Sequence, residues 1–168
     1  SSDMLLLLRV NEATGNENHV IKVYIFYNLV YALLAFPLGF LADRVGIKRI
    51  FLLGLILFSG IYFGMAQART HALFYLLFGI YGIYMGATEG ISKAWVASLC
   101  KKEELGTAIG LFVALQSIAL MIASALAGLL WTFYGASVTF MLTAIMGVFV
   151  FLFVWIFVRK PPSQMEHE

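Results

Sequence analysis

The residues of this sequence best suited to chemistry are Glu89 and Lys93, two opposite charges inside an apolar stretch at about 72–99. A spacing of four residues puts them on one helix face, within reach of an ion pair. The same face carries the small residues Gly82, Gly86 and Gly90, so it is expected to point into a helix bundle. An ionisable group in apolar surroundings is costly unless it is paired or hydrated. Glu89 is therefore expected to bind a proton or another cation, with Lys93 opposing it, or else to be a static partner that neutralises Lys93.

A second set of polar side chains recurs at spacings of three, four and seven residues: Tyr24, Tyr27, Asn28 and Tyr31. These spacings place the four on one face of a helix. Tyr24, Asn28 and Tyr31 are candidates for the wall of a cavity that binds an amphipathic or aromatic solute, and the last two lie deeper. The alternative is that Tyr24, and with it Tyr27, belongs to an aromatic belt at a membrane interface.

Gln116 is a third candidate, near the middle of an apolar stretch at about 105–130. Small residues form a stripe beside it: Gly106, Gly110, Ala114, Ser117, Ser124 and Gly128. A stripe of this kind is typical of close helix packing in membranes. Gln116 could therefore bond to a neighbouring helix or line a pathway for a solute, and both interpretations remain open.

The sequence gives little support for an enzymatic function. Its three histidines lie in polar segments or at the edge of one, so they complete neither a Ser–His pair nor a metal centre within the apolar stretches. Cys100 is the single cysteine, and no glycine-rich phosphate loop is present. The net charge of +2 forms no basic patch for nucleic acid. We expect no catalytic residues, no metal and no cofactor.

Composition decides which solvent surrounds these stretches. The chain is 62% hydrophobic and 12% charged, against about 45–50% and about 25% in soluble domains. A protein of 168 residues cannot hide so large an apolar excess in its core, because much of it would still face outward. The sequence therefore predicts an all-α, polytopic membrane protein in a lipid bilayer.

The lengths of the apolar runs and the polar residues between them give the expected segments. Residues 1–9 are the end of a truncated membrane helix, 9–19 a polar loop, 10–158 a unit with five spans, and 159–168 a polar tail. The five spans are expected at about 20–42, 50–66, 72–99, 105–130 and 138–158. A turn is expected at 131–135.

The basic residues give an orientation. Seven of them fall on one side of the expected membrane: Arg44, Lys48, Arg49, Lys101, Lys102, Arg159 and Lys160. Three fall on the other side: Arg9, Lys22 and Arg69. The positive-inside rule places the first group, and with it the tail and the loop at 43–49, in the cytoplasm of a cell with this protein in its inner or plasma membrane.

A charged turn at 39–49, between the first two complete spans, carries the most specific pattern in the chain. Its sequence is Gly39-Phe-Leu-Ala-Asp43-Arg44-Val-Gly46-Ile-Lys48-Arg49. Gly46 permits a chain reversal. The four charged side chains sit where they can pair with one another, with helix ends or with lipid phosphates.

This pattern resembles the signature loop of the major facilitator superfamily, with Ile47 in place of a common basic residue. Further matches are Tyr81-Gly-Ile-Tyr-Met-Gly-Ala-Thr-Glu-Gly90 and Leu105-Gly-Thr-Ala-Ile-Gly110. The chain as a whole resembles the C-terminal half of bacterial members, from the end of the seventh helix through the twelfth. In addition, Gly39 and Gly46 have counterparts in Gly128 and Gly135, as expected of two inverted three-helix repeats.

The resemblance implies a secondary transporter that moves a small solute by alternating access, proton-coupled or facilitative, often outward as an antiporter. The loop residues Gly39, Asp43, Arg44, Gly46, Lys48 and Arg49 would then latch the cytoplasmic side. The missing N-terminal half of the same transporter would supply the other wall of the cavity. The alternative is a non-transporting membrane fragment that serves assembly or interaction.

Overall fold

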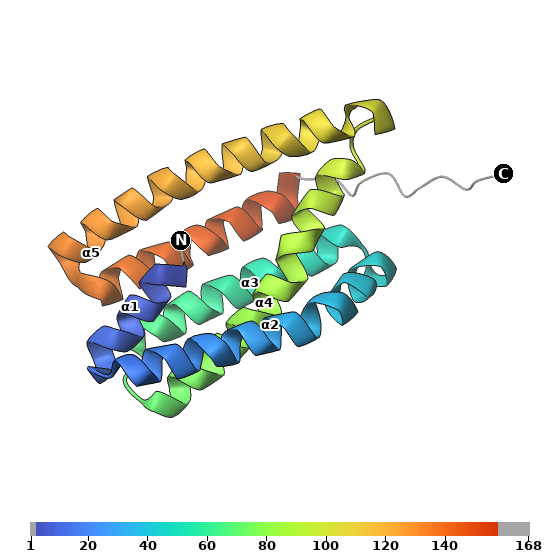
Figure 1. Cartoon of the computed structure of the whole chain (residues 1–168). Coiled ribbons are helices and arrows are strands. Elements are labelled where there is room, and N and C mark those ends of the chain that lie inside the picture. Colours follow the sequence, from blue (N-terminus) through green and yellow to red (C-terminus); the bar gives the residue numbers. More distant parts are fainter. Residues whose placement is uncertain (1–2, 158–168) are drawn as a thin grey trace.

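Helices joined by short turns make up residues 3–157, the part of the chain that the computed structural model describes (Figure 1). The elements are α1 (Asp3–Thr14), α2 (Glu17–Val45), α3 (Ile47–Gln67), α4 (His71–Ala97), the short 3₁₀ helix η1 (Lys102–Glu104) and α5 (Leu105–Phe157). Between residues 3 and 157 there is no strand. By length and composition, α2, α3, α4 and the stretch Lys102–Phe157 can each cross a membrane. The predicted all-α, polytopic fold is confirmed.

Helix α5 contains two membrane-length limbs. Its 53 residues would span about 80 Å as one straight helix, far more than a hydrocarbon core of about 30 Å. The chain reverses at Gly135, which has φ 82° and ψ 169°, and the two limbs run antiparallel in Figure 1. The turn expected over 131–135 is therefore made by one residue, and the limbs include the stretches expected as the fourth and fifth spans, whose bounds in a membrane stay a prediction.

Gly46 makes the corresponding reversal between α2 and α3, as predicted. Its φ of 102° lies outside the range that L-residues favour, and its N–H donates to the carbonyl of Ala42 at 2.9 Å. Gly46 and Gly135 thus have the same role at opposite ends of the bundle. We call these the Gly46 end and the Gly135 end.

The polar loop expected at 9–19 is wrong for most of its length. Helix α1 continues through Arg9 to Thr14, and α2 begins at Glu17. The helix persists because its polar side chains have local partners, such as the ion pair between Arg9 and Glu12 at 3.3 Å. Only Gly15, with φ 61°, and Asn16 form the turn. The Asn16 side chain accepts a bond from the N–H of His19 and so caps α2.

Three helix contacts organise the bundle: α2 with α4, α3 with α4, and α3 with α5. Small residues permit the first of them. A Cβ atom at Gly82 would lie 3.0 Å from the carbonyl oxygen of Tyr27, and one at Gly86 would lie 3.3 Å from the Cα of Ala35. The glycine face predicted to point into the bundle does so at these two positions. At Gly90 a Cβ would meet no atom within 4 Å, so the packing opens toward the Gly46 end.

Candidate functional site

The carboxylate of Glu89 is bound by a phenol from another helix. The Tyr31 hydroxyl of α2 donates to Oε2 of Glu89 on α4 at 2.7 Å. This is the short distance of a hydrogen bond to a charged acceptor. Glu89 and Lys93, both described, form no ion pair with one another, although their spacing would allow it. The static pair considered from sequence is therefore absent, and Tyr31 is the partner instead.

Two hollows meet at Glu89 and Lys93. The first, of about 210 Å³, lies among α3, α4 and the first limb of α5, and its polar lining includes Thr88, Ser92 and Gln116. The second, of about 450 Å³, lies between α2 and α4 and is lined by Tyr31 and Gly39 among others. Glu89 and Lys93 border both. Helix α4 thus separates the two hollows, and its two charged side chains border both of them.

The structure brings some of the sequence candidates together and leaves others apart. Tyr31, Glu89, Lys93 and Gln116 surround these two hollows, and their roles remain predictions. The side-chain amide of Asn28 donates instead to the carbonyl of Tyr24 at 2.8 Å, one turn back on the same helix. Tyr24 is 44% exposed. Neither Asn28 nor Tyr24 lines either hollow.

Asp3 is a polar residue that sequence reasoning missed. The Tyr81 hydroxyl of α4 donates to Oδ1 of Asp3 at 2.6 Å, and that of Tyr27 of α2 donates to Oδ2 at 3.3 Å. Both phenols are almost fully buried. The signal in the sequence is an acidic residue directly before five apolar residues, at the start of the stretch 1–9.

The charged turn expected at 43–49 is helical except at Gly46, because α2 reaches Val45 and α3 begins at Ile47. The start of α3 is bonded to the end of α5. The Lys48 ammonium donates to the carbonyl of Trp155 at 3.3 Å, where the negative end of a helix dipole favours a cation. The guanidinium carbon of Arg44 lies 4.4 Å from the centre of the Phe40 ring. Arg49 is exposed. The side chain of Asp43, and Arg159 and Lys160 of the tail, lie outside what the structure describes.

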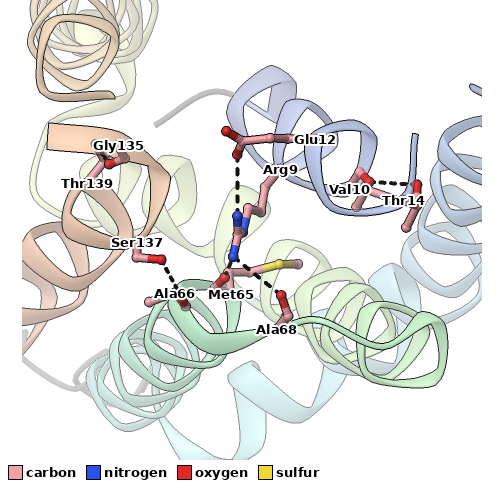
Figure 2. A network of polar contacts seen from close by, with 10 residues as sticks. All are labelled: Arg9, Val10, Glu12, Thr14, Met65, Ala66, Ala68, Gly135, Ser137 and Thr139. Carbon is pink, nitrogen blue, oxygen red and sulfur yellow. Dashed lines mark hydrogen bonds and ion pairs between the residues drawn. The ribbon is translucent and has the colours of Figure 1, made fainter. Parts of the chain in front are cut away.

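A second polar network lies at the Gly135 end (Figure 2). The Arg9 guanidinium donates to the carbonyls of Met65 and Ala68, at 3.3 and 3.4 Å, as well as pairing with Glu12. These carbonyls end α3, so a cation is favoured there. The Ser137 hydroxyl donates to the carbonyl of Ala66 at 2.9 Å. The end of α3 is thereby bound by side chains of both α1 and α5.

No cluster of three or more His, Cys, Asp or Glu residues suited to a metal ion occurs within residues 3–157. The chemistry that the arrangement supports is the binding of protons or polar solutes. Carboxylates, phenols, an amide and an ammonium provide donors and acceptors inside a bundle that is otherwise apolar.

Comparisons with known proteins agree with this arrangement. The sequence profile described as the Major Facilitator Superfamily matches residues 6–168. An uncharacterized MFS-type transporter of Methanocaldococcus jannaschii is 32% identical over 136 residues, which are 77% of this chain and 34% of that protein. An uncharacterized transporter of Buchnera aphidicola subsp. Schizaphis graminum is 27% identical over 141 residues, 83% of this chain and 35% of that protein.

The methyl viologen resistance protein SmvA of Salmonella typhimurium is 30% identical over 108 residues, which are 62% of this chain and 21% of that protein. No solved structure matches at comparable significance. The chain spans about a third or less of the length of the curated relatives that it matches. The match to the family profile covers nearly all of it, so the chain belongs to the Major Facilitator Superfamily of membrane transporters.

Proposed function

We propose that this chain is the C-terminal half of a secondary transporter that moves a small solute by alternating access, driven by protons bound at Glu89. One observation carries the proposal. An intramembrane carboxylate, held by a phenol of a neighbouring helix, borders two hollows with polar side chains. Ionisable groups inside membrane helices mark ion and substrate pathways.

The geometry gives Glu89 two states with different contacts. As a carboxylate it accepts the hydrogen bond of Tyr31 at 2.7 Å. As a neutral acid it becomes a donor, and the charge-assisted part of that bond is lost. Because Tyr31 lies on α2 and Glu89 on α4, binding a proton weakens a contact between these two helices. A solute that enters beside Lys93 and Gln116 would compete for the same site.

The inverted arrangement of the two reversals supports alternating access. Gly46 turns the chain after α2 and Gly135 turns it after the first limb of α5, at opposite ends. Transporters with inverted repeats bind their solute near the bilayer midplane and open to each side in turn. In this proposal the Gly46 end, with Arg44, Lys48 and Arg49, faces the cytoplasm.

The solute class is open to a direct first test. One relative is named for resistance to methyl viologen, an organic dication. The first hollow offers a carboxylate at Glu89 together with the aromatic side chains of Phe51, Tyr84 and Phe112. Aromatic faces and a carboxylate both favour a cation, so an organic cation is the first solute to examine.

The experiment uses the full-length transporter, with its N-terminal half, in proteoliposomes loaded with methyl viologen. An imposed pH gradient is expected to drive movement of the dication in the wild type. Glu89→Gln is expected to abolish this coupling by removing the proton site. Glu103→Gln is the matched control, because Glu103 is exposed in η1 outside the expected spans. Unchanged coupling in Glu89→Gln would remove Glu89 from the mechanism.

A further inference from the structure

Asp3 lies near the middle of the bundle's length, with its side chain partly exposed. It begins the twelve-residue helix α1, which ends near the Gly135 end, so Asp3 is about 18 Å from that end at ~1.5 Å per residue. Half of a hydrocarbon core is about 15 Å. Its partners Tyr27 and Tyr81 lie at a similar depth in α2 and α4. A carboxylate at this depth of a membrane is costly unless it is paired or hydrated, and it is a functional candidate by default.

The described surroundings of Asp3 provide hydrogen bonds and no positive charge. Its two partners are phenols, at 2.6 Å for Tyr81 and 3.3 Å for Tyr27. Tyr62 of α3 and Tyr84 of α4 are the other titratable groups that feel its charge. The nearest cation of α1, Arg9, is bound to the end of α3 and to Glu12. Within residues 3–157, no basic side chain forms an ion pair with Asp3.

A proton can neutralise this carboxylate with a change at only one of its two hydrogen bonds. A carboxylate only accepts hydrogen bonds, whereas a neutral acid also donates one. Protonation at Oδ2, the oxygen with the longer bond, lets the phenol oxygen of Tyr27 become the acceptor. The shorter bond from Tyr81 to Oδ1 is kept. The proton therefore changes one contact, that of α1 with α2.

Helix α2 connects this site to Glu89. Tyr27 and Tyr31 are four residues apart and so lie one above the other on the same helix face. Tyr27 donates to Asp3 on α1, and Tyr31 donates to Glu89 on α4. The two carboxylates are thus held by successive turns of one helix.

We propose that Asp3 is a second proton-binding site of this protein, coupled to Glu89 through Tyr27 and Tyr31 of α2. The proposal rests on the proposed function for its role, since the two protons would then be part of one transport cycle. It concerns a residue outside the Glu89 site. A proton at Asp3 removes the charge-assisted part of the bond between α1 and α2, and a proton at Glu89 does the same to the bond between α2 and α4.

Infrared difference spectroscopy of the full-length transporter tests this without any solute. Spectra recorded between acidic and alkaline pH show the carbonyl band of each carboxylic acid that binds a proton. In the wild type, Asp3 is expected to contribute one such band, and Asp3→Asn is expected to lose it while keeping the Glu89 band. A spectrum of folded Asp3→Asn identical to that of the wild type would overturn the proposal.

Two conservative variants keep the test decisive should Asp3→Asn fail to fold. Tyr81→Phe and Tyr27→Phe retain the carboxyl group and remove one donor each, so each is expected to shift the Asp3 band instead of deleting it. Tyr75→Phe is the control, because Tyr75 of α4 makes ring contacts with His19 and Phe26. An acid band insensitive to Tyr81→Phe and Tyr27→Phe alike would refute the assignment.

The spectra also separate this inference from the proposed transport function. If an imposed pH gradient moves no solute and yet Asp3→Asn loses an acid band, the transport proposal fails and the proton site stands. If transport is proton-coupled and the spectra of wild type and Asp3→Asn agree, the proton site at Asp3 fails and the transport proposal stands. If Glu89→Gln shifts the Asp3 band while Glu103→Gln does not, the coupling through α2 is supported. An unshifted band in Glu89→Gln removes the coupling.

Discussion

Gly135 is predicted to tolerate a side chain poorly because of its backbone conformation alone. Its φ of 82° and ψ of 169° lie in a region that essentially only glycine adopts. A Cβ atom there would meet no atom within 4 Å. The whole effect of Gly135→Ala is therefore backbone strain, with no contribution from a steric clash. We expect it to lower the free energy of unfolding by about 3 kcal/mol, the upper part of the range for strained backbone.

Gly128 provides a control of opposite sign. It lies in the first limb of α5, before Gly135 in the chain, and a Cβ there also meets nothing within 4 Å. Its backbone is helical, and alanine is favoured over glycine in a helix interior by about 0.5–1 kcal/mol. Gly128→Ala is therefore expected to stabilise slightly. The two substitutions add the same methyl group and should differ by about 3–4 kcal/mol.

Equilibrium unfolding of the full-length protein in mixed detergent micelles, followed by circular dichroism, measures both variants. Gly135→Asn is a further check. Asparagine tolerates the left-handed helical region near ψ 47° but not ψ near 169°, so it should destabilise as much as alanine does. The reasoning is refuted if Gly135→Ala is as stable as Gly128→Ala, or if asparagine restores the stability.

Two further predictions concern helix contacts. Arg9→Met removes both bonds to the end of α3 and should lower the free energy of unfolding by about 2–4 kcal/mol. The control is Arg69→Met, at an exposed basic residue of the same end, which should change that free energy by less than about 0.5 kcal/mol. Equal effects of the two substitutions would contradict the role of Arg9. Gly82→Ala places a methyl group 3.0 Å from the carbonyl oxygen of Tyr27 and should destabilise the protein by about 1–2 kcal/mol. Gly90→Ala on the same helix should not destabilise it, because a Cβ there meets no atom within 4 Å. Thermal unfolding of the two variants in detergent measures the difference.

The elements that could be predicted from sequence are those that depend on length and on single residues. An apolar run of membrane length must be a helix in lipid, because its backbone has no other partner there. The reversals follow from Gly46 and from Gly135, each placed where an apolar run ends. Glu89 and Lys93 were found because charges in an apolar run are exceptional.

What could not be predicted depends on how helices are rotated and set against one another. Whether Glu89 pairs with Lys93 or with Tyr31 is a choice between a contact along one helix and a contact between two, and helical spacing reveals only the first. The use of Asn28 to bond the carbonyl of Tyr24 is a local alternative that asparagine always has. The depth of Asp3 followed only once α1 was seen to reach Thr14.

Helix α1 is bonded to α2 and α4 and also to the end of α3. At its start, Asp3 is bound by Tyr27 of α2 and Tyr81 of α4, and further along, Arg9 is bound to the end of α3. Helix α3 in turn contacts α5, whose Ser137 binds the same end of α3. The contact at Asp3 depends on a group that can gain or lose a proton, whereas that at Arg9 depends on a guanidinium, which stays charged. A change of proton occupancy would therefore weaken the bond between α1 and α2 while α1 remains fixed to α3. The movement that the proton controls is then expected between α2 and the rest of the bundle, on the side where Glu89 borders both hollows.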